Sequence, residues 1–158
     1  MNFLGIDPGL QYAGFGVITK NGKQFNLLDC GYLKMNPKAT VAERVHIFYN
    51  YFTALVLKYQ INCVVLETPF LGKNAQNFLK LGYLRGVIYL IAQQQGLQIL
   101  EYTPTQVKLA VTGFGGASKE QVARALKQLF PKLATQVFAK LDMTDALAVT
   151  LCGVWQSS

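Results

Sequence analysis

The segment FLGIDPG, residues 3–9, begins as an apolar run and ends in an acid followed by a turn. Its apolar part predicts a short strand, which the turn-forming pair Pro8-Gly9 stops. A second strand is predicted for YAGFGVIT, residues 12–19, and a third for QFNLLDCGYLKM, residues 24–35. Asn21-Gly22 between them is a strong signal for a tight hairpin turn. The start of the chain therefore predicts a three-strand antiparallel meander.

Segments with helical and strand-like patterns alternate after the meander. Residues 40–58 carry apolar side chains at helical spacing, and INCVVLE, residues 61–67, is an apolar run typical of a strand buried on both faces. A long helix over 74–95 and a strand at LQILEY, residues 97–102, follow. Three further helices are expected to begin near Pro104, Ser118 and Asp142.

This order of elements predicts an α/β fold. The three-strand antiparallel meander and two parallel strands would form a five-stranded mixed sheet, with helices on both faces. The 158 residues are most simply one domain, 1–158, and a hydrophobic content of 51% excludes a disordered chain. No apolar run reaches the roughly 18 residues of a membrane helix, and the N-terminus does not look like a signal peptide. We therefore expect a cytoplasmic protein without a membrane partner.

The predicted helix over 74–95 is apolar on two faces. One stripe consists of Phe78, Leu81, Leu84, Ile88 and Ile91, and the other of Leu79, Tyr83, Val87 and Leu90. A helix of this kind must be covered on both faces. One face can pack on the sheet, and the other requires a second helix or another subunit. We expect Leu84 to lie in such a subunit interface.

Four acids stand in apolar surroundings, although the chain has only eight acidic residues and a net charge of +7. Asp7 ends the first strand, Glu67 ends the buried strand, and Asp142 and Asp145 open the last predicted helix. Burying an unpaired carboxylate is costly, so such acids usually have a cation, a metal or a network of donors as their partner. The four acids together predict a divalent-metal site.

Each acid also has a structural interpretation when it is taken alone. Asp7 can form an Asx-turn before Pro8, and Asp142 and Asp145 can be an acidic pair that the dipole of a helix N-terminus favours. Three separate acid positions in a basic chain favour the metal. Carboxylates suit Mg²⁺ or Mn²⁺, and two such ions ~3.5–4 Å apart can promote phosphodiester hydrolysis. Because His46 is the single histidine, zinc sites and Ser-His-Asp triads are excluded.

Positive charge is concentrated in one part of the chain. Nine of the 15 basic residues, but only two of the eight acids, lie between residues 70 and 140. A localised positive field is typical of proteins that bind nucleic acid. The alternative interpretation is that these basic residues form a solvated surface that keeps the protein soluble.

Several motifs together resemble the RuvC family of Holliday-junction resolvases, in the ribonuclease H-like superfamily. They are GIDPG (5–9), GFGVI (14–18), ExxFxxKNA (67–75), LKLGYLRGV (79–87), QVK (106–108), GxGxxxKxQV (113–122) and DMTDALAV (142–149). GIDPG alone is weak evidence for this family, because actin-like ATPases carry a similar strand and turn. All seven motifs in this order, over nearly the whole chain, are highly specific.

The resemblance implies a ribonuclease H-like fold and assigns candidate roles to nine residues. The implied catalytic and metal-binding residues, for two Mg²⁺ ions per site with Mn²⁺ as a substitute, are Asp7, Glu67, Asp142 and Asp145. The implied DNA contacts are Phe70 at the junction centre, Lys108 and Lys119 on phosphates near the cut, and Lys73 and Lys80 along the backbone. On the residues alone, Phe70 can instead belong to the core, and the lysines can be ordinary surface residues.

The resemblance also implies an activity and partners. It indicates a structure-selective, Mg²⁺-dependent crossover junction endodeoxyribonuclease of DNA recombination and repair. Paired symmetric nicks in two strands of like polarity would resolve four-way junctions and leave 5′-phosphate and 3′-hydroxyl ends. The helix around 74–95 would form a homodimer, and a branch-migration complex is a further candidate partner. A ribonuclease, a flap nuclease and a non-catalytic junction-binding protein remain alternatives.

Overall fold

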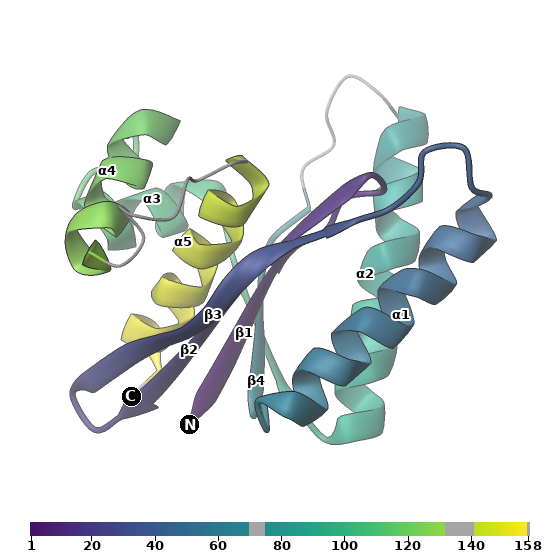
Figure 1. Ribbon diagram of the computed structural model, residues 1–158. Coiled ribbons are helices and arrows are strands. Elements are labelled where there is room, and N and C mark those ends of the chain that lie inside the picture. Colours follow the sequence, from purple (N-terminus) through teal and green to yellow (C-terminus); the bar gives the residue numbers. More distant parts are fainter. Residues whose placement is uncertain (70–74, 132–140, 158) are drawn as a thin grey trace.

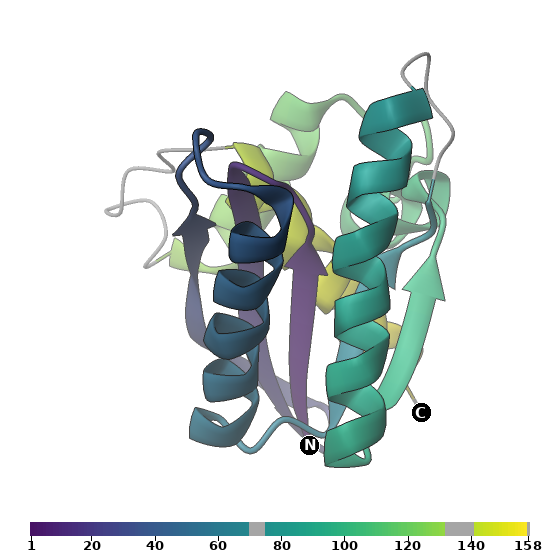
Figure 2. The same ribbon diagram turned by 90° about the vertical axis from the view of Figure 1, so that its right-hand side faces the viewer.

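The computed structural model describes residues 1–69, 75–131 and 141–157, with Leu141 and Asp142 described as helix backbone only (Figures 1 and 2). A five-stranded mixed sheet occupies its centre, in the order β3-β2-β1-β4-β5. Strands β1 (Asn2–Asp7), β2 (Tyr12–Asn21) and β3 (Gln24–Lys34) form the antiparallel meander. Strands β4 (Cys63–Glu67) and β5 (Gln98–Tyr102) run parallel to β1. The sheet predicted from the sequence is confirmed.

Helices cover both faces of the sheet, as predicted (Figure 1). On one face lie α1 (Val41–Lys58) and α2 (Ala75–Gln95), which share a core with the sheet. On the other lies α5 (Leu141–Gln156), which α3 (Pro104–Thr112) and α4 (Lys119–Leu129) cover from outside. None of the described helices is long and apolar enough to cross a membrane.

The strand pleat determines which way the acids at the strand ends point. Ile6 and Leu66 are paired positions of β1 and β4, and both belong to the core beneath α1 and α2. Successive side chains of a strand point to opposite faces of the sheet. Asp7 and Glu67, the next residues of the two strands, therefore point toward the α5 side.

Two glycines let α5 lie close to the sheet. Gly5 of β1 pairs with Gly16 of β2, beneath the helix. A Cβ atom at Gly5 would lie 2.0 Å from Thr150 Oγ1 and 2.5 Å from Ala146 O, both in α5. Thr150 Oγ1 also donates a hydrogen bond of 2.6 Å to Ala146 O, which keeps that side chain compact. The absence of a side chain at Gly5 thus sets the depth at which α5 packs.

A cation from the sheet holds the other end of α5. The Lys20 ammonium, in β2, donates hydrogen bonds to Val154 O at 2.9 Å and to Ser157 O. These carbonyls belong to the last turn and the end of the helix, where the dipole favours positive charge. Lys20 therefore fixes α5 lengthwise along the sheet.

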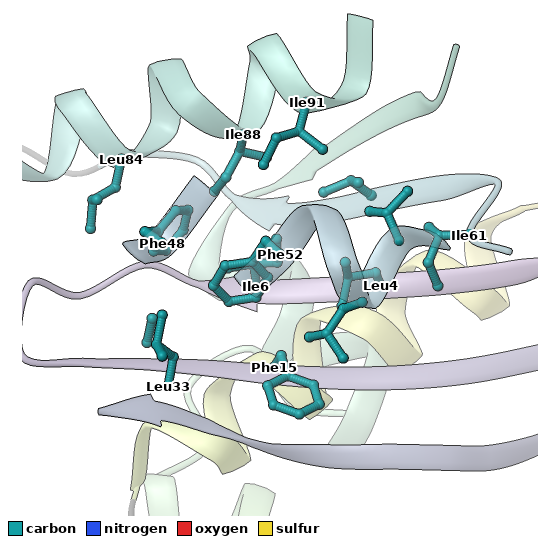
Figure 3. Close-up of a cluster of buried hydrophobic side chains, with 14 of the residues drawn as sticks. Leu4, Ile6, Phe15, Leu33, Phe48, Phe52, Ile61, Leu84, Ile88 and Ile91 are labelled. Atoms are coloured by element: carbon teal, nitrogen blue, oxygen red, sulfur yellow. The ribbon is translucent and has the colours of Figure 1, made fainter. Parts of the chain in front are cut away.

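The structure separates the two apolar stripes of α2, and the position expected for Leu84 is wrong. Leu84 and Ile88 are 0% and 1% exposed and point into the core with α1, as Figure 3 shows. Three residues of the other stripe are outside, with Leu79, Tyr83 and Leu90 exposed to 59%, 47% and 50%, whereas Val87 packs partly against the core. Both stripes are apolar, so composition alone could not decide which one faces the sheet.

We predict that Gly5→Ala destabilises the fold, because the new methyl group would push α5 away from β1. Overpacking of this kind costs about 1–3 kcal/mol, and the rigid carbonyl at Ala146 favours the upper end of that range. Urea unfolding followed by circular dichroism measures the change.

Gly82→Ala is the matched control, because a Cβ at this position of α2 would meet no atom within 4 Å. Exchange of an open helical glycine for alanine should stabilise the protein, by about 0.5–1 kcal/mol. An unchanged urea midpoint for Gly5→Ala would show that α5 does not depend on this close contact.

Candidate active site

Two cavities share Glu67 at the carboxyl end of β4. The larger, about 480 Å³, lies between the ends of β1 and β4 and helix α2, and Asp7, Glu67 and Arg85 are among its lining residues. The smaller, about 190 Å³, is lined by residues of α3, α4 and α5, with Lys108, Lys119 and Asp145 among them. Glu67 therefore stands between a cavity at the strand ends and a cavity lined by Asp145 and two lysines.

Asp145 reaches this place from the first turns of α5. The Lys119 ammonium, at the first residue of α4, donates a hydrogen bond of 2.8 Å to Asp145 Oδ2. The Lys119 side chain is 57% exposed and that of Asp145 is 29% exposed. An exposed pair of this kind contributes at most about 1 kcal/mol to stability. The lysine can therefore exchange its partner for a phosphate at little cost to the fold.

The electrostatic surroundings of Glu67 favour a cation nearby. Burial, and then the negative charge of Asp145, raise the pKa of the Glu67 carboxyl above its ordinary value. The positive charges of Lys119 and Lys108 act in the opposite direction and lower this pKa. A further cation between the acids would relieve the repulsion between the carboxylates.

The structure brings some of the predicted acids together. Asp7 and Glu67 line one cavity, and Glu67 and Asp145 line the other. The backbone of Asp142 lies three residues before that of Asp145 in α5, on the same side of the helix. Among the side chains that the structure describes, no group of three or more acids, histidines or cysteines is arranged to hold a metal ion. The four-acid metal site therefore stays a prediction.

The structure also brings only some of the predicted DNA-binding residues to the acids. Lys108 and Lys119 line the cavity of Glu67 and Asp145. Lys80, in α2, lines a separate hollow beside the start of α1, which shares no lining residue with either acid cavity. Phe70 and Lys73 lie outside the described residues. The roles of all five remain predictions.

The structure adds a contact that the sequence did not predict. Arg85 of α2 donates a hydrogen bond of 2.7 Å from Nη1 to the backbone carbonyl of Glu67, and it forms an ion pair with Glu101 of β5. The signal for this pair was visible but weak. Arg85 interrupts an apolar stretch of its helix, and Glu101 follows the apolar pair Ile99-Leu100 of its strand.

We predict that Glu67→Gln stabilises the protein at pH 8 in the presence of a chelator. The native pKa is raised, so the native state holds its proton to a higher pH than the unfolded state, and stability falls as pH rises through this window. Glutamine avoids this loss. The gain should shrink toward zero below about pH 4, where glutamate is protonated in both states. Thermal unfolding as a function of pH measures it.

Glu120→Gln is a control with the opposite sign. Hydrogen bonds from its own backbone amide and from Ser118 lower the pKa of Glu120, so this carboxylate stabilises the fold above its unfolded pKa and the benefit is lost as pH falls. Its replacement should lower stability at pH 8. A Glu67→Gln variant that is less stable than the parent at pH 8 would contradict the electrostatic account of the site.

The chain is similar to known proteins over nearly its whole length. Residues 3–153 match the family described as crossover junction endodeoxyribonuclease RuvC. Proteins of that name from Pelodictyon phaeoclathratiforme and Chlorobium phaeovibrioides are each 42% identical to the chain, over 96% of it and over 78% and 80% of their own lengths. The Thermus thermophilus RuvC structure in complex with a Holliday junction substrate superposes with a TM-score of 0.87, at 28% identity, covering 96% of this chain and 92% of the other.

Proposed function

The chain belongs to the RuvC family of crossover junction endodeoxyribonucleases, and on that basis we propose that it resolves four-way DNA junctions. The proposed reaction is a pair of symmetric nicks in strands of like polarity, with 5′-phosphate and 3′-hydroxyl products. The observation that carries the proposal most directly is the cavity where Glu67 and Asp145 meet Lys108 and Lys119. Acids alone would repel a phosphodiester, whereas lysines in the same cavity can bind one.

The donor chemistry of the acids fits a hard divalent cation. Asp7, Glu67, Asp142 and Asp145 offer only carboxylate oxygens, the ligands that Mg²⁺ prefers. Burial, and then Asp145, raise the pKa of Glu67, so a bound cation would stabilise its ionised form. We propose that these four residues hold Mg²⁺, two ions per site, and that Mn²⁺ can substitute. When bound, such ions supply an activated water and stabilise the leaving oxygen.

The lysines would hold the substrate while the acids hold the ions. Lys108 and Lys119 can each donate to a non-bridging phosphate oxygen at the mouth of the smaller cavity. For Lys119 this means giving up its exposed pair with Asp145, which frees that carboxylate for another cation. Phe70, Lys73 and Lys80 are proposed to bind the junction beyond the cut, through base stacking and backbone contacts. The reaction fits a cytoplasmic enzyme, with a branch-migration complex as a proposed partner.

A homodimer on the exposed stripe of α2 would match the symmetry of the substrate. Leu79, Tyr83 and Leu90 lie on one side of the helix and are 47–59% exposed. A Cβ atom at Gly86, which lies on the helix between Tyr83 and Leu90, would meet nothing within 4 Å, so another helix can approach closely there. A two-fold dimer presents two identical sites, as paired nicks in a four-way junction require.

Asp7→Asn is expected to abolish cleavage of a synthetic four-way junction in Mg²⁺ while junction binding in a chelator stays intact or becomes tighter. Removal of a carboxylate takes away a proposed metal ligand and also lowers repulsion of the polyanion. Single-turnover cleavage and gel-shift titration measure the two effects. Glu43→Gln, which removes an exposed carboxylate but keeps the helix cap of α1, should cut at the parental rate. Retained cutting by Asp7→Asn would refute the site.

Leu90→Asp is expected to convert a dimer into monomers, because a carboxylate cannot be buried unpaired in an apolar interface. Analytical ultracentrifugation measures the assembly state, and circular dichroism verifies the fold. Leu57→Asp is the matched control, since Leu57 is 61% exposed but lies on α1. If Leu90→Asp still sediments as a dimer, the interface does not use this stripe.

A further inference from the structure

Arg85 is a buried cation whose contacts converge on one acid of the proposed site. It is 8% exposed. Its Nη1 donates to Glu67 O at 2.7 Å, while its Nη2 contacts Glu101 Oε1 and Tyr89 Oη, the latter at 3.2 Å. Tyr89 Oη in turn donates to Glu101 Oε1 at 2.7 Å. Four residues from three elements, α2, β4 and β5, therefore constrain one another through directed hydrogen bonds.

The chemistry of arginine makes this arrangement rigid. A guanidinium stays charged at any ordinary pH, and its donors form a planar fork of fixed geometry. Burial of such a group is tolerated only when an opposite charge and hydrogen-bond acceptors surround it. Glu101 supplies the charge from β5, and Tyr89 supports it from the next turn of α2. The remaining arm of the fork is directed at the Glu67 carbonyl.

The contacted carbonyl lies where β4 leaves the sheet. Glu67 is the last residue of β4, and the amide of Thr68 makes the next hydrogen bond, 2.8 Å to Tyr102 O. Pro69 follows and has no amide proton to donate. Backbone hydrogen bonding to the sheet therefore ends just after the residue that lines both cavities. A hydrogen bond from Arg85 at this point fixes the direction of the Glu67 side chain through its main chain.

We propose that Arg85 is a positioning residue, which together with Glu101 and Tyr89 fixes Glu67 for cation binding and cleavage. This inference rests on the proposed role of Glu67 as a metal-binding acid. Arg85 also lines the larger cavity, so a direct contact with a DNA phosphate is the competing role. Its fork is occupied by protein acceptors and it is almost fully buried, which favours positioning over DNA contact.

The test compares Arg85→Met, Arg85→Lys, Glu101→Gln and Tyr89→Phe in three measurements on the intact protein. Electron paramagnetic resonance gives the affinity of the free protein for Mn²⁺. Single-turnover assays give the cleavage rate at saturating junction and Mg²⁺. Gel-shift titration in a chelator gives the junction Kd and its dependence on salt. The first measurement needs neither DNA nor activity, so it examines Glu67 directly.

Loss of a group that orients a metal ligand typically weakens metal affinity or activity about 10–100-fold. We expect a loss in this range for Arg85→Met in both Mn²⁺ affinity and cleavage, with junction Kd within about twofold of the parent and an unchanged salt slope. Arg85→Lys should recover part of the loss, since an ammonium can reach one acceptor but not hold the fork. The loss for Glu101→Gln should lie between those of the two Arg85 variants, and Tyr89→Phe should show the smallest loss of the four.

Lys58→Met is the charge-matched control. It removes an exposed cation from the last turn of α1, which adjoins the start of β1 and so the opposite end of the sheet from Asp7. Parental Mn²⁺ affinity and cleavage are expected for it. Thermal unfolding of every variant separates a misplaced Glu67 from a lost fold, and if Arg85→Met does not fold, Arg85→Lys and Glu101→Gln carry the test.

Two results would overturn the inference. One is a folded Arg85→Met that binds Mn²⁺ and cuts like the parent, or, if that variant does not fold, parental values for both substitutes. The other is a weaker junction Kd with a salt slope smaller by about 0.9 and unchanged Mn²⁺ affinity, which would make Arg85 a phosphate contact. A parent protein whose Mn²⁺ affinity depends on Arg85 as expected, but which does not cut junctions, would instead contradict the proposed function alone.

Discussion

The close packing of α5 on the glycines of β1 and β2 is the constraint on which the rest of the structure depends. With no side chain at Gly5, the helix packs its backbone directly on the strand that ends in Asp7. Lys20 anchors its far end, so the near end, with Asp145, is placed at the carboxyl edge of the sheet. The pleat turns Glu67 toward the same side. A packing contact in the core thus determines where the acids of the proposed site meet.

The proposed site combines charges that the fold keeps close at an energetic cost. Burial and Asp145 make the ionised form of Glu67 unfavourable, and two lysines compensate for only part of this effect. Such an arrangement contributes little to stability, but it suits a cation and a phosphate that arrive together. Lys119 is an example, because its exposed ion pair with Asp145 is weak enough to be replaced by a contact with a substrate phosphate. Arg85, in contrast, is fully engaged and buried, as a group that orients another residue should be.

The sequence predicted the elements well because their signals are local. Turn residues, alternation and helix caps indicated all ten elements of the described residues, and the ends of two strands and a helix indicated the acids. Leu84 shows where local signals fail, since two apolar stripes on α2 are equivalent until the sheet is present. The contact between Arg85 and Glu101 joins residues of different elements, so only the fold reveals it. The motif resemblance assigned the family correctly, but it gave Arg85 no role.

The central claim is that Asp7, Glu67, Asp142 and Asp145 gather around divalent cations beside Lys108 and Lys119. Anomalous diffraction from crystals of the protein soaked in Mn²⁺ tests it most directly. The account predicts strong manganese peaks among these carboxylate oxygens, with Glu67 contacting at least one ion. Crystals that show no manganese there, or show it bound elsewhere while the carboxylates lie far apart, would contradict it.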